Sequence, residues 1–203
     1  MEDDMDIERT IRNLKNNRFD VSVFENSEEA SEYLKSRLKG TVGTGMSVTI
    51  RDMGIYDWLS EGHEGITFYD RFHSNNMHEE LRKSLTADIF LTGANAITED
   101  GMLYNVDGTG NRVAGLTYGP KKVYVVAGIN KIVKNLEEAV ERVEKTAAPL
   151  NCERLNKKAP CLISGRCVHC NFSETICSSY VVTRRSHVEH RIEVILIKDN
   201  LGY

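Results

Sequence analysis

Apolar residues along the chain switch repeatedly between strand and helix spacing, which predicts an α/β fold. Apolar stripes at helical spacing predict helices near residues 7–14, 27–38, 52–60, 77–85 and 136–143. Short apolar or alternating runs predict strands at residues 19–24, 65–69, 87–92, 102–105 and 123–127. The runs at 87–92 and 123–127 are apolar enough to be buried on both faces of a sheet. Strands that alternate with helices in this way favour a mostly parallel, doubly wound sheet.

The pattern changes after residue 149. Residues 150–187 show little periodicity, and one more strand is expected at 192–197. We therefore predict an α/β body over residues 1–149. Residues 150–203 are predicted to form an irregular, Cys-rich metal-binding segment and a final strand that packs on the same domain.

Composition and charge are those of an ordinary soluble domain. The chain has 203 residues, 40% of them hydrophobic, and its 26 basic and 30 acidic residues give a net charge of −4. Without a basic stretch, nucleic acid is not an expected partner. The N-terminus is acidic where a secretory signal is basic, and the apolar runs are too short to span a bilayer. We expect a cytoplasmic protein that does not enter a membrane.

The five cysteines are the unusual feature of the composition. All of them lie in the last third of the chain, and four form the array Cys161-x5-Cys167-x2-Cys170-x6-Cys177. In a reducing compartment, closely spaced thiols are more often metal ligands or redox groups than disulfides. Zinc and a [4Fe–4S] cluster both accept four thiolates. A zinc site more often has two Cys-x-x-Cys pairs and this array has one, so iron–sulfur is favoured and zinc is the alternative.

Other interpretations of the array stay open. The four thiols are also compatible with a reduced surface loop or with a redox disulfide. Cys152 is interpreted as a small apolar residue that can substitute as a ligand. Further alternative ligands are histidines in or after the array: His169, His187 and His190.

A glycine turn near residue 45 is the first candidate binding element. Gly43, Gly45 and Ser47 lie at a predicted strand-to-helix turn, where backbone N–H groups can cradle a phosphate or carboxylate. The turn lacks the dinucleotide fingerprint and the P-loop lysine, so neither a nicotinamide cofactor nor a nucleoside triphosphate is expected. The alternative is a turn whose glycines serve only the backbone conformation.

The second candidate element is the polar stretch 93–112, which follows a predicted buried strand. Its side chains are therefore expected outside the carboxyl end of the sheet, where ligands bind in this architecture. Glu99 and Asp107 are the candidate acid/base groups. The candidates for binding a polar or anionic substrate are Asn95, Asn111 and Arg112.

Several longer motifs resemble the lactate-utilization (LUD) domain family over nearly the whole chain. They are Gly93-Ala94-Asn95-Ala96-Ile97-Thr98-Glu99-Asp100-Gly101, Gly110-Asn111-Arg112, Gly119-Pro120-Lys121-Lys122-Val123, Ala127-Gly128-Ile129-Asn130-Lys131-Ile132 and Ala147-Ala148-Pro149. The tail, from Pro160-Cys161 through Gly165-Arg166-Cys167 to Cys177 and Leu201-Gly202-Tyr203, is similar to that of short, stand-alone members with a Cys-rich end.

The resemblance implies a Rossmann-like sheet of the sugar-phosphate isomerase and coenzyme A transferase superfamily. It also implies a link to the oxidation of lactate or another small hydroxy acid, together with iron–sulfur partner proteins. Aldose-phosphate isomerases of the superfamily have a catalytic Asp where this chain has Asn95, and an amide cannot take up that proton. This makes Glu99 the better acid/base or nucleophilic candidate.

Three functional hypotheses follow from these observations. The first is an oxidoreductase component that binds a small anionic substrate and an iron–sulfur cluster. The second is an isomerase or an acyl or coenzyme A transferase with a structural zinc site. The third is a non-catalytic assembly subunit of an iron–sulfur oxidoreductase. A homodimer is compatible with each of them.

Overall fold

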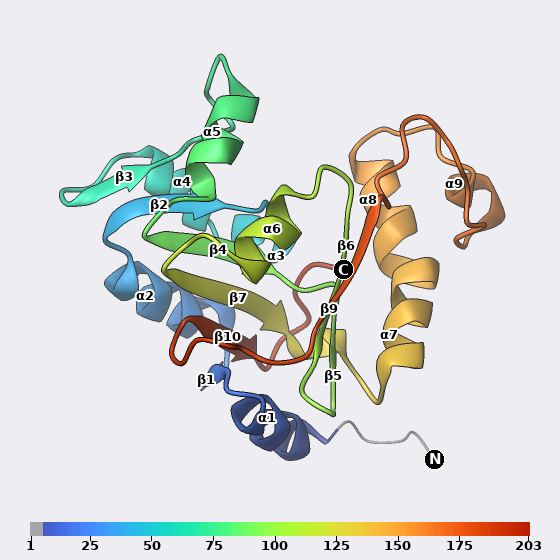
Figure 1. Ribbon diagram of the computed structural model, residues 1–203, viewed down its shortest axis with the longest axis horizontal. Helices are drawn as coiled ribbons and strands as arrows, with labels where there is room; N and C mark the ends of the chain where they lie inside the picture. The colour runs from blue at the N-terminus through green and yellow to red at the C-terminus, as the bar shows by residue number, and fades with distance from the viewer. Residues whose placement is uncertain (1–5) are drawn as a thin grey trace.

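Six parallel strands form the central sheet of the protein. The computed structural model describes residues 6–203, and Figure 1 shows the sheet with helices on both of its faces. From one edge to the other, the strands are β1 (Asp20–Phe24), β10 (Ile192–Ile197), β7 (Lys122–Gly128), β4 (Ile89–Gly93), β2 (Gly40–Thr44) and β3 (Ile66–Phe68). All five neighbouring pairs are parallel, so the predicted parallel α/β fold is confirmed.

The buried strands carry apolar side chains on both faces. Along β4, Ile89 and Leu91 belong to one hydrophobic core and Phe90 to the other, because successive side chains of a strand point to opposite faces. Three helices cover the first face: α2 (Ser27–Arg37), α3 (Val48–Asp52) and α4 (Ile55–Ser60). Two helices pack on the second face: α1 (Ile7–Asn16) and α6 (Asn111–Thr117). Helix α5 (Met77–Ser84) packs on β2 and α6.

The tail of the chain returns to the central sheet. Strand β10 lies between β1 and β7, with Val194 opposite Val21 on one side and Val125 on the other. All six residues of β10 are buried. The segment that carries the cysteines is therefore anchored at its end in the core of the α/β body.

A second, smaller sheet was not expected from the sequence. Its strands, in order, are β8 (Ile132–Val133), β5 (Ala96–Thr98), β6 (Leu103–Asp107) and β9 (Ser179–Thr183). Its pairs are mixed, since β5–β6 and β6–β9 are antiparallel and β5–β8 is parallel. Strands as short as β5 and β8 do not produce a readable alternation of apolar and polar residues.

One long helical segment packs on the second sheet. It consists of α7 (Leu136–Arg142), a π-helical turn η2 (Val143–Ala147) and α8 (Ala148–Arg154). The helical segment continues through Pro149. This residue lies in the first turn of α8, where proline is tolerated. The remaining elements are the short helix α9 (Cys161–Ser164) and the 3₁₀ turn η1 (Ile129–Lys131).

The single helix expected at 52–60 is instead two helices. Helices α3 and α4 are separated by Gly54, which has a φ of +70°. A residue in the left-handed backbone conformation cannot continue a right-handed helix, and glycine adopts that conformation without strain. Within residues 6–203, no helix combines the length and the apolar character that crossing a bilayer requires.

Helix α1 is fixed to the β5–β6 hairpin through backbone oxygens. Asn13 donates a hydrogen bond to the carbonyl of Glu99 at 2.7 Å, and Asn17 donates to the carbonyls of Asp100 and Gly101 at 3.0 Å. Gly101 has a φ of +78°, and a Cβ atom there would lie 2.5 Å from the carbonyl carbon of Asn13. The contact therefore requires glycine at this position.

We predict that Gly101→Ala destabilises the protein by about 2–3 kcal/mol. The alanine would be strained in the left-handed backbone conformation, and its Cβ atom would also clash with α1. Gly62→Ala is the matched control, since Gly62 has a φ of +80° and nothing within 4 Å of the added Cβ. Its cost is expected to be about 1 kcal/mol, from strain alone. Chemical denaturation measures both values, and equal losses in the two variants would show that the close contact with α1 is unimportant.

Candidate functional site

A cavity of about 710 Å³ lies where the two sheets meet. Its wall includes Gly45 and Ser47, which follow β2, and Gly93 and Asn95, at the end of β4. Asp107 contributes from the end of β6. The carboxyl ends of strands in both sheets thus supply the wall, which is the usual ligand position in open α/β sheets.

Positively charged side chains dominate the wall of this cavity. Two carboxylates, Asp107 and Glu174, face six cations: Arg51, Arg71, Arg112, Lys131, Arg154 and Lys157. Arg51 pairs with Asp52 at 2.9 Å, and Lys157 pairs with Glu174 at 3.6 Å. Within residues 6–203, the other four cations form no ion pair with a carboxylate. The cavity therefore carries an excess of positive charge that favours an anion.

The Arg112 guanidinium is buried at the centre of this charge. It donates to the carbonyl oxygens of Gly93 at 3.3 Å and Val106 at 2.7 Å, and to the side-chain oxygens of Asn95 at 2.9 Å and Asn105. All four acceptors are neutral. Burial lowers the pKa of Arg112, although an arginine stays protonated at physiological pH. Arg112 thus holds the strands in place and adds an unpaired positive charge to the wall.

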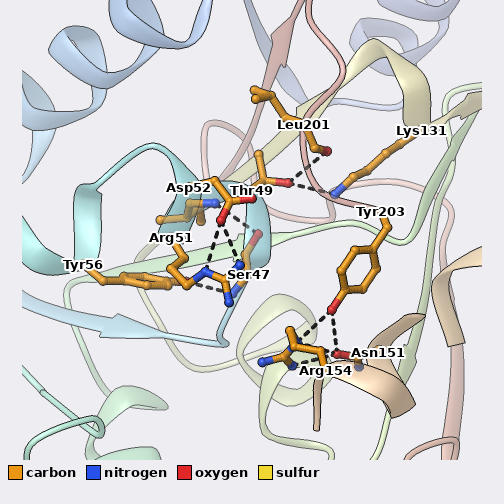
Figure 2. A network of polar contacts seen from close by, with 11 residues as sticks. Ser47, Thr49, Arg51, Asp52, Tyr56, Lys131, Asn151, Arg154, Leu201 and Tyr203 are labelled. Atoms are coloured by element: carbon orange, nitrogen blue, oxygen red, sulfur yellow. Dashed lines mark hydrogen bonds and ion pairs between the residues drawn. The ribbon is translucent and has the colours of Figure 1, made fainter. Parts of the chain in front are cut away.

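Lys131 supplies a second buried cation, with a side chain that reaches the cavity from η1. The residue is 3% exposed, and its Nζ donates to Thr49 Oγ1 at 2.9 Å. Thr49 Oγ1 in turn donates to the carbonyl oxygen of Leu201 at 3.3 Å (Figure 2). Burial, reinforced by the charges of Arg142 and Arg112, lowers the pKa of Lys131 to about 7.

The last residues of the chain form another part of the wall. Tyr203 lies with its hydroxyl group toward α8, where Arg154 Nε donates to it at 2.7 Å (Figure 2). Arg154 Nη2 also donates to Asn151 Oδ1 at 2.6 Å. These contacts orient the Arg154 guanidinium through neutral groups and leave its charge unpaired.

The structure brings most of the predicted binding residues together. Those that line the cavity are Gly45, Ser47, Asn95, Asp107, Asn111 and Arg112. Gly43 does not reach it, because its position inside β2 is set by packing: a Cβ atom there would lie 2.6 Å from Ser84 Cβ in α5. Gly43 is therefore needed for close packing of α5 on β2 and not for ligand contact.

Glu99 also lies outside the cavity wall. Its side chain is buried against α1, with Oε2 3.3 Å from Arg9 Nη1 and Oε1 accepting from the Asp6 amide at 3.3 Å. Strand β5 carries the chain from the wall residue Asn95 toward this position. The expectation that Glu99 acts on a bound ligand is thus not met in this cavity, because its carboxylate instead fixes α1.

The backbone amides of the glycine turn already have partners. Gly45 N donates to the Leu91 carbonyl at 2.9 Å, Met46 N to Thr44 Oγ1 at 3.1 Å, and Ser47 N to the Tyr56 hydroxyl at 2.8 Å. They do not form the anion cradle that the sequence led us to expect. Gly45 instead allows Arg112 to approach, since a Cβ there would lie 2.6 Å from Arg112 Cγ.

The side chains of Asp107 and Asn95 are held in place by the same network. Asp107 Oδ2 accepts from the amides of Arg112 at 3.0 Å and Val113 at 3.2 Å, and so caps the first turn of α6. Asn95 Oδ1 accepts from the Val106 amide at 2.9 Å as well as from Arg112. Both residues shape the wall, and Asp107 is one of its two carboxylates.

Sequence reasoning missed several wall residues, among them Arg71, Lys131, Arg154 and Tyr203. They come from separate parts of the chain, and no local motif joins them. Lys131 had a usable signal, because it follows the apolar run of β7 at the carboxyl edge of the sheet. Inspecting the residues after every predicted strand would have identified it.

All five cysteines line a second cavity, of about 280 Å³. None forms a disulfide, and Cys152, which sequence reasoning treated as an ordinary apolar residue, lines the cavity with the four array cysteines. The His169 amide donates to Cys167 Sγ at 3.3 Å. Burial raises the pKa of Cys177 to about 11 and that of Cys152 to about 12, and neighbouring thiols add to both shifts.

The cysteine sulfurs are spread around this cavity and not gathered at one point. Within residues 6–203, one set of three potential metal ligands has its ligand atoms within 4.8 Å of one another, namely Glu144, Cys167 and His169. No three cysteine sulfurs meet that criterion. Two candidate metal sites therefore share Cys167: the more widely spaced cysteines of the cavity, and a compact group of Glu144, Cys167 and His169.

The two cavities share a wall. Thr175 lines both of them, and the segment around it packs on the end of β6. Ser178 N donates to the Asp107 carbonyl at 2.9 Å, and a Cβ at Gly108 would lie 3.1 Å from Ile176 Cα. A ligand in the cationic cavity and a group in the cysteine cavity would therefore be neighbours.

Comparison with known proteins places this chain in a family. A profile of the LUD domain matches residues 7–197. The chain is also similar in fold to a DUF162 family protein from Deinococcus radiodurans, at 17% identity and a TM-score of 0.53, over 94% of this chain and 95% of that one. Among curated proteins, no match is found. With its α/β sheet and nearly its whole length matched, the chain belongs to the LUD domain family.

Proposed function

We propose that this protein binds a small carboxylate in the cationic cavity, either a 2-hydroxy acid such as lactate or the corresponding 2-oxo acid. The observation that carries the proposal is the group of four cations, Arg71, Arg112, Lys131 and Arg154, without a carboxylate partner. Buried cations are costly unless an anion compensates them. The link of LUD domains to lactate utilization, which the sequence resemblance implies, agrees with this ligand class.

Arg71 and Arg154 are the proposed direct ligands for the carboxylate. The Arg112 guanidinium already donates four hydrogen bonds to protein groups, so it contributes mainly its charge. Arg71 is half-buried at the cavity wall, and burial lowers its pKa. A guanidinium can bind a carboxylate through two parallel hydrogen bonds.

For the cysteine cavity we propose a [4Fe–4S] cluster held by Cys161, Cys167, Cys170 and Cys177. Four thiolates on one zinc ion lie at about 2.3 Å from the metal and hence close to one another. The sulfurs here are spread around a cavity instead, which suits a cluster better than a single ion. The amide bonded to Cys167 Sγ is of the type that stabilises cluster thiolates. When bound, such a cluster supplies one-electron transfer.

The two sites together favour a component of a hydroxy-acid oxidoreductase over an isomerase or an acyl transferase. Glu99, the carboxylate on which the transferase hypothesis depended, is bound to Arg9 outside the cavity. Unpaired thiols suit a reducing compartment, so we place the protein in the cytoplasm. An iron–sulfur protein is the proposed partner, because a cluster near the surface needs a source or acceptor of electrons.

Metal analysis tests the cluster directly. Protein purified anaerobically is expected to contain iron and sulfide in about equal amounts, with broad absorbance near roughly 400 nm. Cys170→Ser is expected to lose most of the iron, whereas Glu144→Gln keeps it, since Glu144 is not a proposed cluster ligand. Stoichiometric zinc that is lost in Glu144→Gln and retained in Cys170→Ser would establish the compact Glu–Cys–His site and refute the cluster.

Calorimetric titration with lactate and pyruvate tests the cationic cavity. Arg71→Met and Arg154→Met are each expected to weaken binding about 10- to 100-fold, as expected for loss of a charge-assisted hydrogen bond worth roughly 1.5–3 kcal/mol. Arg37→Met serves as the control, because Arg37 is an exposed residue of α2 that does not line the cavity. Equal affinity in all four proteins would mean that the carboxylate binds elsewhere.

A further inference from the structure

We propose that Lys131 is a nucleophile that forms a reversible imine with a 2-oxo acid bound in the cationic cavity. This inference rests on the proposed function and narrows it, because it selects the 2-oxo acid as the ligand that the protein can hold covalently. It assigns to Lys131 a role that differs from the charge and hydrogen bonding supplied by the arginines.

The position of Lys131 is the first argument. Its side chain lines the cavity, yet the residue as a whole is 3% exposed. Its Nζ has one hydrogen bond, to the neutral Thr49 Oγ1 at 2.9 Å (Figure 2), and within the described chain it forms no ion pair with a carboxylate. Structural lysines that are buried are normally paired with an acid, so a buried, unpaired lysine at a ligand cavity needs another explanation.

The charges around Lys131 favour the neutral amine that a nucleophile requires. Arg112 from α6 and Arg142 from α7 both disfavour a further positive charge, and Asp52 from α3 opposes them more weakly. Burial is the largest influence, and together these effects give the amine a pKa of about 7. The neutral amine is therefore reached at a lower pH than in an exposed lysine. Desolvation and cationic neighbours are the known means of activating a lysine for imine formation.

The surroundings of the amine restrict where a ligand can approach. Gly202 packs against it, since a Cβ atom at this glycine would lie 3.3 Å from Lys131 Nζ and 2.7 Å from Thr49 Oγ1. Thr49 occupies a second side through its hydrogen bond. Thr49 and Gly202 thus hold the amine on two sides, and Lys131 lines the same cavity as Arg71 and Arg154, which can bind the ligand's carboxylate.

The chemical step needs no further reactant. The Nζ lone pair forms a C–N bond to the ketone carbon, and the ketone oxygen takes up the proton that the nitrogen loses, which gives a carbinolamine. That oxygen accepts a second proton from solvent water and leaves as water, and the product is a protonated imine. Addition of water reverses the sequence, and no atom changes its net oxidation level. A 2-hydroxy acid has no ketone carbon, so it cannot react in this way.

Borohydride trapping followed by peptide mass spectrometry tests the proposal on the protein as purified anaerobically. With pyruvate and sodium borohydride, a reduced pyruvyl adduct is expected on the peptide that contains Lys131. Lactate with borohydride is expected to leave no adduct. Lys157→Arg should retain the adduct, because Lys157 also lines the cavity but pairs with Glu174. Lys131→Arg and Lys131→Met should lose it.

Calorimetry on the same samples separates the two proposals. Lys157→Arg keeps Lys131 and the four unpaired cations, so it is expected to bind pyruvate within a few-fold of wild-type affinity. Lys131→Arg is expected to show no adduct and weaker binding of pyruvate, because the covalent bond is lost. Pyruvate binding to the wild-type protein without an adduct, or an adduct spread over surface lysines, would overturn the imine and leave the binding function intact. Absence of both binding and adduct would overturn both. Because the wild-type adduct is mapped directly, the result does not depend on the folding of either variant.

Discussion

The buried guanidinium of Arg112 is the interaction on which the site depends. It joins the end of β4, through the Gly93 carbonyl, to Asn105 and Val106 in β6, and it also holds Asn95. One side chain therefore fixes the central sheet to the second sheet where the cavity opens. Its hydrogen bonds are satisfied by neutral oxygens, so the geometry is stabilised while the charge is not cancelled. The preference for an anion follows from this arrangement.

The central sheet could be predicted because its strands are buried on both faces. The run from Val123 to Ala127 and that from Ile89 to Leu91 are continuous apolar segments, which in an α/β chain are typical of parallel strands. The second sheet could not be predicted, because β5 and β8 span only three and two residues. What defines these strands is pairing with neighbours and packing against α7, and both are properties of the tertiary structure.

The candidate site was predictable in part, for a related reason. The stretch from Asn95 to Arg112 could be located because it follows a buried strand, and Asp107 and Arg112 line the cavity at that edge of the sheet. The chemical type of a residue does not reveal which side chains it contacts in the folded protein. Glu99 had the right chemistry but is bound to Arg9, and Cys152 is a buried core residue that also lines the cysteine cavity. Both outcomes depend on packing between segments that are distant in sequence.

We propose that an anion site and a metal centre form one functional unit, with the segment around Thr175 as their common wall. The most direct test is the electron paramagnetic resonance spectrum of the reduced protein, recorded with and without saturating pyruvate. A ligand next to the cluster is predicted to shift the g values or to broaden the signal in the wild-type protein. An unchanged cluster spectrum at a pyruvate concentration that calorimetry shows to be saturating would contradict the account.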